Sequence, residues 1–484
     1  MDIHQSEILD PTVGWILLSI LSGLWIYLGF YWGKKAKNMD GFMLAGRNVG
    51  MAFGTATAMA TWVTSNTTML APQFALQLGI WGMVAYSSAA FGLLLFAPLA
   101  KRIKQLLPKA FTSGDFIRLR YGKTTWYLFL VISIFYGFTW LISMGMAGGI
   151  LMNALAGIPY KTGMTVILAV CVIYTVFGGL YAVIGTDFIQ SLIIMIGIVI
   201  VGGAVIFSLD LDQVYANLEL EKPMLINALL PASIMAIFNN LLFGIGEVFH
   251  SNVWWSRAFA MRSGIGQKAY TMAGFFWLPV PIAAGFIALT TGTFDINITS
   301  PDMVGPLMAG NILGKAGSVI VFIVFFCSLA SSIDSLLAAT SDLIVEDIYK
   351  KMINPGVKEK KLRKVSVIII VSLGLLAWMV CLPRIGTLAT VLFFAGPMVA
   401  STIYPIVMGL YWRSASAKGA FLAMLLGSLI GLIGYFELGW YTGSLIGATV
   451  SIIVTTLFAK LNKTPFDWAK MDESKIISTN KILQ

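Results

Sequence analysis

Long apolar stretches follow one another along this chain, and short polar segments, most of them basic, separate them. An α-helix rises about 1.5 Å per residue, so about 20 apolar residues cross the hydrocarbon core of a membrane, which is about 30 Å thick. We therefore predict an all-α bundle of about 13 transmembrane helices. The predicted spans are 12–33, 49–75, 78–100, 125–156, 162–182, 184–207, 229–253, 269–292, 317–343, 365–386, 388–412, 417–436 and 440–461.

The composition supports the same class of protein. Hydrophobic residues account for 58% of the 484 residues and charged residues for only 11%. A soluble domain of this composition would expose a large apolar surface to water, so we predict one integral membrane domain. Cys171, Cys327 and Cys381 lie far apart in apolar stretches, which favours buried thiols over disulfides or a metal site.

The basic residues predict the orientation, because loops on the cytoplasmic side are enriched in Lys and Arg. If the N-terminus lies outside, the inner segments contain 28 of the 32 Lys and Arg residues. These segments are 34–48, 101–124, 257–268, 344–364, 413–418 and the tail from residue 460. We therefore predict a multi-pass protein of the plasma or inner membrane, with its N-terminus outside and a cytoplasmic tail, 462–484.

The same basic segments account for the net charge of +10. Since they lie between membrane spans, we expect them to touch anionic membrane lipids and do not expect a nucleic-acid partner. The sequence indicates no oligomeric state.

Polar residues cluster inside the predicted span 317–343, where a lone charge would cost several kcal/mol. Hydroxyl groups share an arc of about 100° on a helix that turns about 100° per residue. They belong to Ser328, Ser331, Ser332 and Ser335, and Asp334 flanks them. Such serines can bond back to carbonyl groups of their own helix or let helices pack closely, but oxygen groups are also the ligands of hard cations. Both interpretations stay open.

Other spans also contain polar breaks. The sequence TWVTSNTT interrupts 49–75 and Pro72 follows, which predicts either a broken helix that lines a cavity or a kinked packing helix. Asp187 follows a glycine-rich stretch and could bind a cation or cap a helix. The polar cluster GEVFHSN, residues 246–252, could face either the interior or the inner surface.

Enzymatic motifs are missing from the sequence. One of the two histidines is His4, in the N-terminal tail, and no His-Glu-x-x-His, Gly-x-Ser-x-Gly or Walker A pattern occurs. The sequence GNILGKAG has the wrong spacing for a phosphate-binding loop. We therefore expect no enzymatic activity and no organic cofactor.

The sequences FGGLYAVIGTDFIQ and SLASSIDSLLAATSDLIVEDIYK, together with the interrupted second span, resemble the sodium:solute symporter family along nearly the whole chain. The resemblance implies the leucine-transporter-type fold, with two five-helix inverted repeats at about 49–207 and 229–412. The helix 12–33 and the two helices in 417–461 would then be peripheral. The segments VIYTVFGGLYAVIGTDFIQ and LLLFAPLAKRIKQLLPKAFT are most similar to the urea and polyamine active-transporter branch.

The resemblance also implies binding residues. A co-transported sodium ion would bind the carbonyl groups of Ala60, Val63 and Ser328 and the hydroxyl groups of Ser331 and Ser332. A second cation or proton site would involve Asp187, Asp334 and Ser335. Substrate contacts would come from Ser65, Asn66, Thr67, Ser251 and Asn252. Ser328 stands where the family has alanine, and Asp334 where it has serine.

These inferences predict a secondary active transporter. We expect sodium-coupled symport of a small polar organic solute by alternating access, with urea or a related small amide or amine favoured. The alternatives are a sodium symporter for another solute (a sugar, proline or a monocarboxylate), a proton-coupled symporter, and a passive channel of the urea type.

Overall fold

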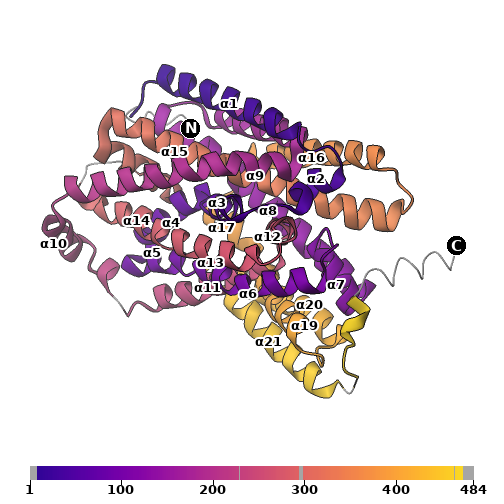
Figure 1. Ribbon diagram of the computed structural model, residues 1–484. Coiled ribbons are helices and arrows are strands. Elements are labelled where there is room, and N and C mark those ends of the chain that lie inside the picture. The colour runs from indigo at the N-terminus through magenta and orange to yellow at the C-terminus, as the bar shows by residue number, and fades with distance from the viewer. Residues whose placement is uncertain (1–7, 228, 294–297, 463, 472–484) are drawn as a thin grey trace.

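The computed structural model describes residues 8–227, 229–293, 298–462 and 464–471 (Figure 1). Within these residues the chain is almost entirely helical, and strand-like pairing is limited to an isolated bridge between Val49 and Met261. Eleven helices of the described part are long and apolar enough to cross a membrane. The prediction of an all-α integral membrane protein is confirmed. Most of the predicted tail, 462–484, lies outside the described residues.

The α-helices follow in chain order. They are α1 (Pro11–Gly33), α2 (Met39–Leu44), α3 (Met51–Trp62), α4 (Ser65–Leu78), α5 (Ile80–Ser87), α6 (Ala90–Leu106), α7 (Ser113–Tyr121), α8 (Lys123–Ala156), α9 (Tyr160–Ser208), α10 (Leu211–Glu221), α11 (Pro231–His250), α12 (Asn252–Ala260), α13 (Ile265–Trp277), α14 (Pro279–Leu289), α15 (Val304–Leu343), α16 (Glu359–Cys381), α17 (Leu388–Phe394), α18 (Gly396–Ser401), α19 (Ile403–Tyr411), α20 (Ala417–Leu438) and α21 (Gly443–Leu461).

Two predicted boundaries differ from the structure. The span 49–75 consists of two short helices, α3 and α4, neither of which is long enough to cross a membrane alone. The spans 162–182 and 184–207 correspond to two helical parts of α9 that meet at a kink at Gly179, a few residues before the predicted boundary. Eleven long helices are found instead of thirteen because α9 is counted once and neither α3 nor α4 is long enough to be counted.

Helix α15 lies in the interior of the bundle, where it packs against α8 and α9 and also contacts α3, α4 and α12. Every residue from Val324 to Leu343 is buried. Figure 1 shows α1 along one edge of the bundle, where it packs on α9, while α20 and α21 pack on each other at the opposite edge. The polar arc of α15 therefore faces protein and not lipid.

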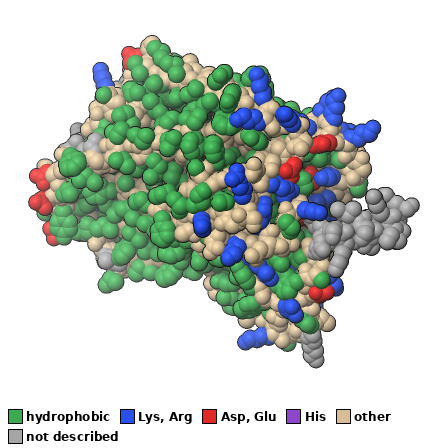
Figure 2. Space-filling view, viewed as in Figure 1, with side chains coloured by type: hydrophobic (Ala, Val, Ile, Leu, Met, Phe, Trp, Pro, Cys, Tyr) green, Lys and Arg blue, Asp and Glu red, His purple; other side chains and the backbone are tan. Residues whose placement is uncertain are grey.

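The surface separates apolar from basic side chains. Figure 2 shows a broad apolar area over most of the visible face, while Lys and Arg gather toward one end of the molecule. Elements at that end include α2, α7 and the start of α16 (Figure 1). Such a distribution is typical of a protein that spans a membrane with one basic, cytoplasmic end.

The bend in α9 yields a stability prediction. Gly179 has a φ of 52° and a ψ of −141°, and a Cβ at this position would lie 2.4 Å from the backbone oxygen of Phe42. We expect Gly179→Ala to lower the free energy of unfolding by about 1–3 kcal/mol, because the backbone would be strained and the contact too close. Thermal unfolding of the purified protein in detergent measures this loss.

The control is Gly203→Ala in the same helix, where nothing lies within 4 Å of the added Cβ. Alanine favours a helix over glycine by about 1 kcal/mol, so this variant should be as stable as the wild type or more stable. Equal melting temperatures of the two variants would contradict the assigned bend.

Candidate functional site

The interruption between α3 and α4 lies at Val63 and Thr64. The Val63 backbone is not helical, with a φ of −78° and a ψ of 77°. Thr64 then begins α4 with a capping box: its hydroxyl accepts from the Thr67 amide at 3.1 Å, and the Thr67 hydroxyl accepts from the Thr64 amide at 3.2 Å. The sequence TSNT thus starts a new helix in mid-span, as a capping box does elsewhere. The predicted break is present.

The break leaves carbonyl groups of α3 without helical partners, and side chains bind them. The carbonyl of Trp62 accepts hydrogen bonds from the Thr67 hydroxyl at 3.0 Å and from the indole of Trp277 at 2.6 Å. The carbonyl of Ala60 accepts one from the Ser331 hydroxyl at 2.9 Å. Ser331 therefore joins α15 directly to the end of α3.

The structure brings four of the five predicted sodium ligands together. Within α15 the Ser328 carbonyl accepts the back-bonds of Ser331 at 3.2 Å and Ser332 at 2.8 Å, which serines in helices ordinarily make, and Ser331 also reaches the Ala60 carbonyl of α3. All of them are fully buried. The Ser328 hydroxyl bonds to Val324 O within its own helix, so only its carbonyl takes part in the cluster. Val63, the fifth, is buried at the break, three residues after Ala60.

A second buried cluster surrounds Asp187. The guanidinium of Arg257 on α12 lies 3.2 Å from the Asp187 carboxylate and donates to Ser335 at 2.6 Å. It also donates to the hydroxyl groups of Thr57 and Thr61 on α3, at 3.0 and 2.7 Å. Thr57 in turn donates to Asp187 at 2.5 Å. A positive charge of the protein itself thus lies between two residues of the predicted second cation site.

The third residue of that site, Asp334, has different neighbours. Its carboxylate accepts hydrogen bonds from the Tyr174 hydroxyl at 2.9 Å and from Ser335 at 3.2 Å. The ion pairs found among the described residues do not include Asp334. It is fully buried, and the Ser335 hydroxyl that it contacts is the one that also binds Arg257.

A small cavity lies beside the break. It offers about 20 Å³ in which the centre of a water molecule fits, enough for little more than one water molecule in this conformation. Two predicted substrate residues, Asn66 and Thr67, line it. The full lining consists of Trp62, Thr64, Asn66, Thr67, Tyr86, Ala89, Trp140, Asn240, Phe243, Glu247, Trp277 and Leu392.

Three predicted substrate residues do not line this cavity. The Ser65 hydroxyl donates to the sulfur of Met144. Ser251 interrupts the chain between α11 and α12 and caps α12, and Asn252 binds the Ser113 amide and the Ala339 carbonyl, each at 3.0 Å. Substrate contact by these three residues stays a prediction.

Two buried charged residues escaped assignment from the sequence. Arg257 was counted with the inner basic segments, yet its side chain is fully buried. Glu247 belongs to a polar cluster that could have faced the inner surface, but it is only 3% exposed and lines the cavity. The aromatic residues of the cavity could not be assigned to a site from the sequence either, because tryptophan is frequent throughout this chain.

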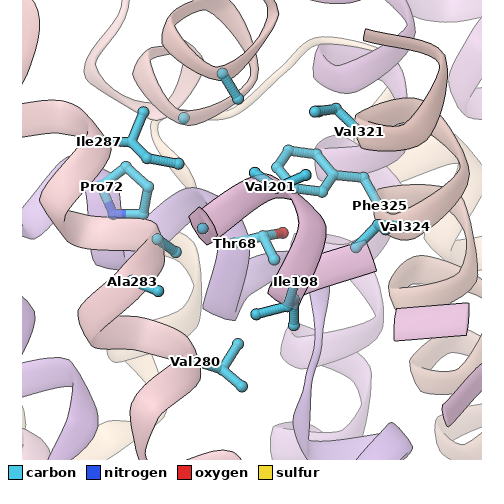
Figure 3. A pocket seen from close by; sticks show the side chains of 14 residues that line it. Thr68, Pro72, Ile198, Val201, Val280, Ala283, Ile287, Val321, Val324 and Phe325 are labelled. Carbon is cyan, nitrogen blue, oxygen red and sulfur yellow. The ribbon is translucent and has the colours of Figure 1, made fainter. Parts of the chain in front are cut away.

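Another cavity lies among α4, α9, α14 and α15. Figure 3 shows its lining: Thr68 and Pro72 of α4 face apolar side chains such as Ile198, Val280 and Phe325. Because almost every group that lines it is apolar, this cavity offers no ligands for an ion and few for a polar solute.

Comparison with known proteins identifies the family. Residues 42–427 match the model of the sodium:solute symporter family. The chain belongs to this family. The resemblance to the sodium:solute symporter family that the sequence indicated is therefore confirmed.

The relatives of this chain include transporters of urea and of proline. The chain is 27% identical to the urea-proton symporter DUR3 of Oryza sativa subsp. japonica, over 81% of this chain and 60% of that protein. It is 25% identical to the urea active transporter of Saccharomyces cerevisiae, over 95% and 69% of the two chains. The proline transporter PutP of Bacillus subtilis is 26% identical, over 83% and 88%. The chain thus spans three fifths of the rice relative's length.

Solved structures confirm the fold. A Na⁺-coupled sialic acid symporter superposes with a TM-score of 0.76 at 16% identity, over 94% of this chain and 98% of that chain. Mhp1, a nucleobase-cation-symport-1 family transporter, gives 0.53 at 15% identity, over 89% and 96%. The leucine-transporter-type fold is therefore confirmed, while the repeat boundaries at 49–207 and 229–412 stay predictions. The relatives and structural neighbours are transporters and not enzymes, and this chain is a multi-pass membrane protein of the symporter family.

The buried pair of Asp187 and Arg257 gives a testable expectation. Asp187→Asn leaves the guanidinium charge buried without its partner, which should lower the free energy of unfolding by about 3–5 kcal/mol. Thermal unfolding measures the loss, and Asp212→Asn on the exposed α10 is the control. The double variant Asp187→Asn/Arg257→Gln should lose less than the sum of the single losses. Additive losses would show that the two side chains do not interact.

Proposed function

We propose that this protein couples sodium entry to the uptake of a small polar organic solute by alternating access. The observation that carries the proposal is the hydrogen bond from Ser331 on α15 to the Ala60 carbonyl at the end of α3. In this fold such a junction connects a broken helix to a neighbouring bundle, and an ion bound there can favour one arrangement of the two. Urea or a related small amide or amine is the favoured solute class, consistent with the urea-transporting relatives.

The proposed sodium ligands are the carbonyl groups of Ala60, Val63 and Ser328 and the hydroxyl groups of Ser331 and Ser332. They are neutral oxygen groups, all buried, and the Ser331 hydroxyl of α15 already bonds to the Ala60 carbonyl of α3. Serine hydroxyls rotate freely and can turn a lone pair toward a cation. A sodium ion bound there would replace the Ser331–Ala60 hydrogen bond and would itself connect the same two helices, α3 and α15.

We further propose that one sodium ion is transported per cycle. The guanidinium of Arg257 occupies the space between Asp187 and Ser335, where the second cation was expected, and supplies a fixed positive charge there. One sodium ion per cycle supplies enough free energy for uphill transport. A membrane potential of about 100 mV contributes about 2.3 kcal/mol, and a tenfold sodium gradient contributes about 1.4 kcal/mol. Together they permit about 500-fold accumulation of a neutral solute.

Proton coupling is the second candidate, and Asp334 favours it. Its buried carboxylate has hydroxyl partners but no ion pair in the described chain. A rice relative is also named a urea-proton symporter. A passive channel is less well supported, because buried side chains occupy the carbonyl groups at the helix break and leave no open path there among the described residues.

The proposed orientation of the protein in the membrane follows from its basic end. We propose that the basic end seen in Figure 2 is cytoplasmic, in the plasma or inner membrane, and touches anionic lipids there. The inverted repeats would then be 49–207 and 229–412. The interruption at Ser251 supports this division, because it falls in the first span of the second repeat as Val63 does in the first.

Sodium binding tests the ligand assignment without any knowledge of the solute. We expect Ser331→Ala and Ser332→Ala each to weaken binding of radioactive ²²Na⁺ to the purified protein at least tenfold, since each removes a ligand. Ser328→Ala is a matched control on the same helix: its hydroxyl bonds to Val324, and its carbonyl remains. Unchanged binding in the two variants, or an equal loss in the control, would refute the site.

Proteoliposomes distinguish the coupling ions. We expect uphill uptake of a labelled solute to follow an inward sodium gradient, with a Hill coefficient for sodium near 1, and to survive Asp334→Asn. A proton gradient that drives uptake without sodium, with loss of this uptake in Asp334→Asn, would support the second candidate instead. Simple equilibration across the membrane would indicate a channel.

A further inference from the structure

A third cavity lies at the basic end of the protein, between α1, α9 and the start of α3. It offers about 310 Å³ in which the centre of a water molecule fits, within the range of about 300–1,000 Å³ for small-molecule sites. The cavity beside the helix break is far smaller. The side chains that decide what this third cavity can hold belong to Trp32, Asn48, Phe53, Tyr181 and Arg262, and Gly185 completes the wall.

The charge at this cavity is positive. Arg262 is exposed and belongs to the lining, and the residues that line the cavity include no acid. The Nε atom of Arg262 donates to the amide oxygen of Asn48 at 2.7 Å, while its two Nη atoms have no hydrogen-bond partner among the described residues. Lys35 adds a second positive charge, with its Nζ atom 4.1 Å from the centre of the Trp32 ring. The site therefore favours an anion, and a phosphate group matches the fork of an arginine.

The indole of Trp32 supplies a second donor. Its Nε1 atom is shielded from solvent but has no hydrogen-bond partner within the described part of the chain. The ring lies against Gly185, where an added Cβ would come within 2.4 Å of it, and the Phe53 ring meets it edge-on with centroids 6.0 Å apart. An indole N–H can only donate, so an occupant that satisfies it must bring an acceptor.

The cavity continues into a surface that faces lipid. Beyond the kink, α9 turns about 100° per residue, so Leu192, Ile196 and Val199 share an arc of about 60° with Gly185. Their side chains are 51%, 60% and 69% exposed. This apolar stripe extends about 21 Å from Gly185, and one leaflet of the hydrocarbon core is about 15 Å thick. The stripe is therefore long enough for an acyl chain that begins at the cavity.

The aromatic residues agree with this position. Trp32, Phe53 and Tyr181 are half-buried and come from three different helices, α1, α3 and α9. Tryptophan and tyrosine are enriched where a membrane meets water, because their rings are apolar and their N–H and O–H groups are polar. The cavity thus has donors and a positive charge on the water side and apolar groups on the lipid side.

We propose that this cavity binds one anionic glycerophospholipid of the cytoplasmic leaflet. The lipid phosphate accepts hydrogen bonds from Arg262 and from the Trp32 indole, and Lys35 helps to neutralise the headgroup. One acyl chain lies along the α9 stripe. The inference rests on the orientation proposed above, and it replaces a general contact of the basic end with anionic lipids by a single defined site.

Phosphatidylglycerol and phosphatidylcholine with identical acyl chains form a matched pair of probes, because both contain the phosphate but only phosphatidylglycerol has a net charge. Native mass spectrometry of the purified full-length protein in detergent resolves each bound lipid and gives the affinity of the first one. We expect this first lipid to bind at least fivefold more tightly when it is phosphatidylglycerol. Equal affinity, or a preference for phosphatidylcholine, would overturn the proposal.

Three variants test the assigned contacts. Arg262→Gln should weaken binding of the first phosphatidylglycerol about fivefold. Trp32→Phe keeps a ring and removes the N–H group, so it should weaken binding of both lipids at least threefold. The control is Lys418→Gln, an exposed basic residue at the start of α20, at the opposite edge of the bundle. Wild-type affinity in Arg262→Gln, or an equal loss in Lys418→Gln, would overturn the site.

Inorganic phosphate tests whether the acyl chain takes part. Millimolar phosphate, compared with chloride at equal ionic strength, should not displace the first phosphatidylglycerol, because the free ion makes no contact with the α9 stripe. Displacement of this lipid from the wild type would identify a site for free phosphate and would overturn the lipid assignment.

Sodium binding separates this inference from the proposed function. Arg262→Gln should bind ²²Na⁺ as the wild type does, which also shows that the variant is folded. If the wild type binds sodium without a preference for phosphatidylglycerol, the symport proposal stands and the lipid site fails. If phosphatidylglycerol is preferred but sodium does not bind, the lipid site stands and the symport proposal fails.

Discussion

A helix cannot be interrupted inside a membrane unless other groups bind the backbone carbonyls that the break exposes. This constraint governs the centre of the protein. The carbonyl of Trp62 is bound by Thr67 and Trp277, and that of Ala60 by Ser331. The last of these contacts joins the broken helix to α15, on which α8 and α9 also pack. A ligand bound between these two oxygens would therefore contact both helices at once.

The buried charges near this junction divide into three environments. Asp187 is neutralised by Arg257, with threonine hydroxyls of α3 and Ser335 completing the cluster. Asp334 has only hydroxyl partners, which stabilise a carboxylate less than a cation does. Glu247 lines the cavity beside the break together with aromatic side chains. Among the described residues, only the first of these three acids forms an ion pair.

Much of the fold could be predicted because the physical signals are strong and local. Apolar length determines which stretches cross the membrane, and the polar sequence TWVTSNTT marks the break between α3 and α4. The serine arc of α15 could be placed on one face because helical periodicity is fixed. The glycine-rich stretch predicted the division of α9 only to within a few residues, because more than one glycine could form the kink that the structure has at Gly179.

The site could be predicted only in part, because burial and pairing depend on distant segments. Arg257 resembles any basic residue after a span until α3, α9 and α15 surround it. The Ser328 hydroxyl turned out to bond back to Val324, the ordinary role of serine in a helix, whereas Ser331 reaches another helix. Sequence spacing alone does not distinguish these two serines.

A structure determined in saturating sodium chloride, beside one in choline chloride, tests the proposed coupling most directly. In sodium, density for an ion should lie among the oxygens of Ala60, Val63, Ser328, Ser331 and Ser332, with the Ser331–Ala60 hydrogen bond replaced by contacts of both oxygens to the ion. In choline, the hydrogen bond should remain. The same direct hydrogen bond in both conditions, with no density between α3 and α15, would contradict the proposal that sodium binds at this junction.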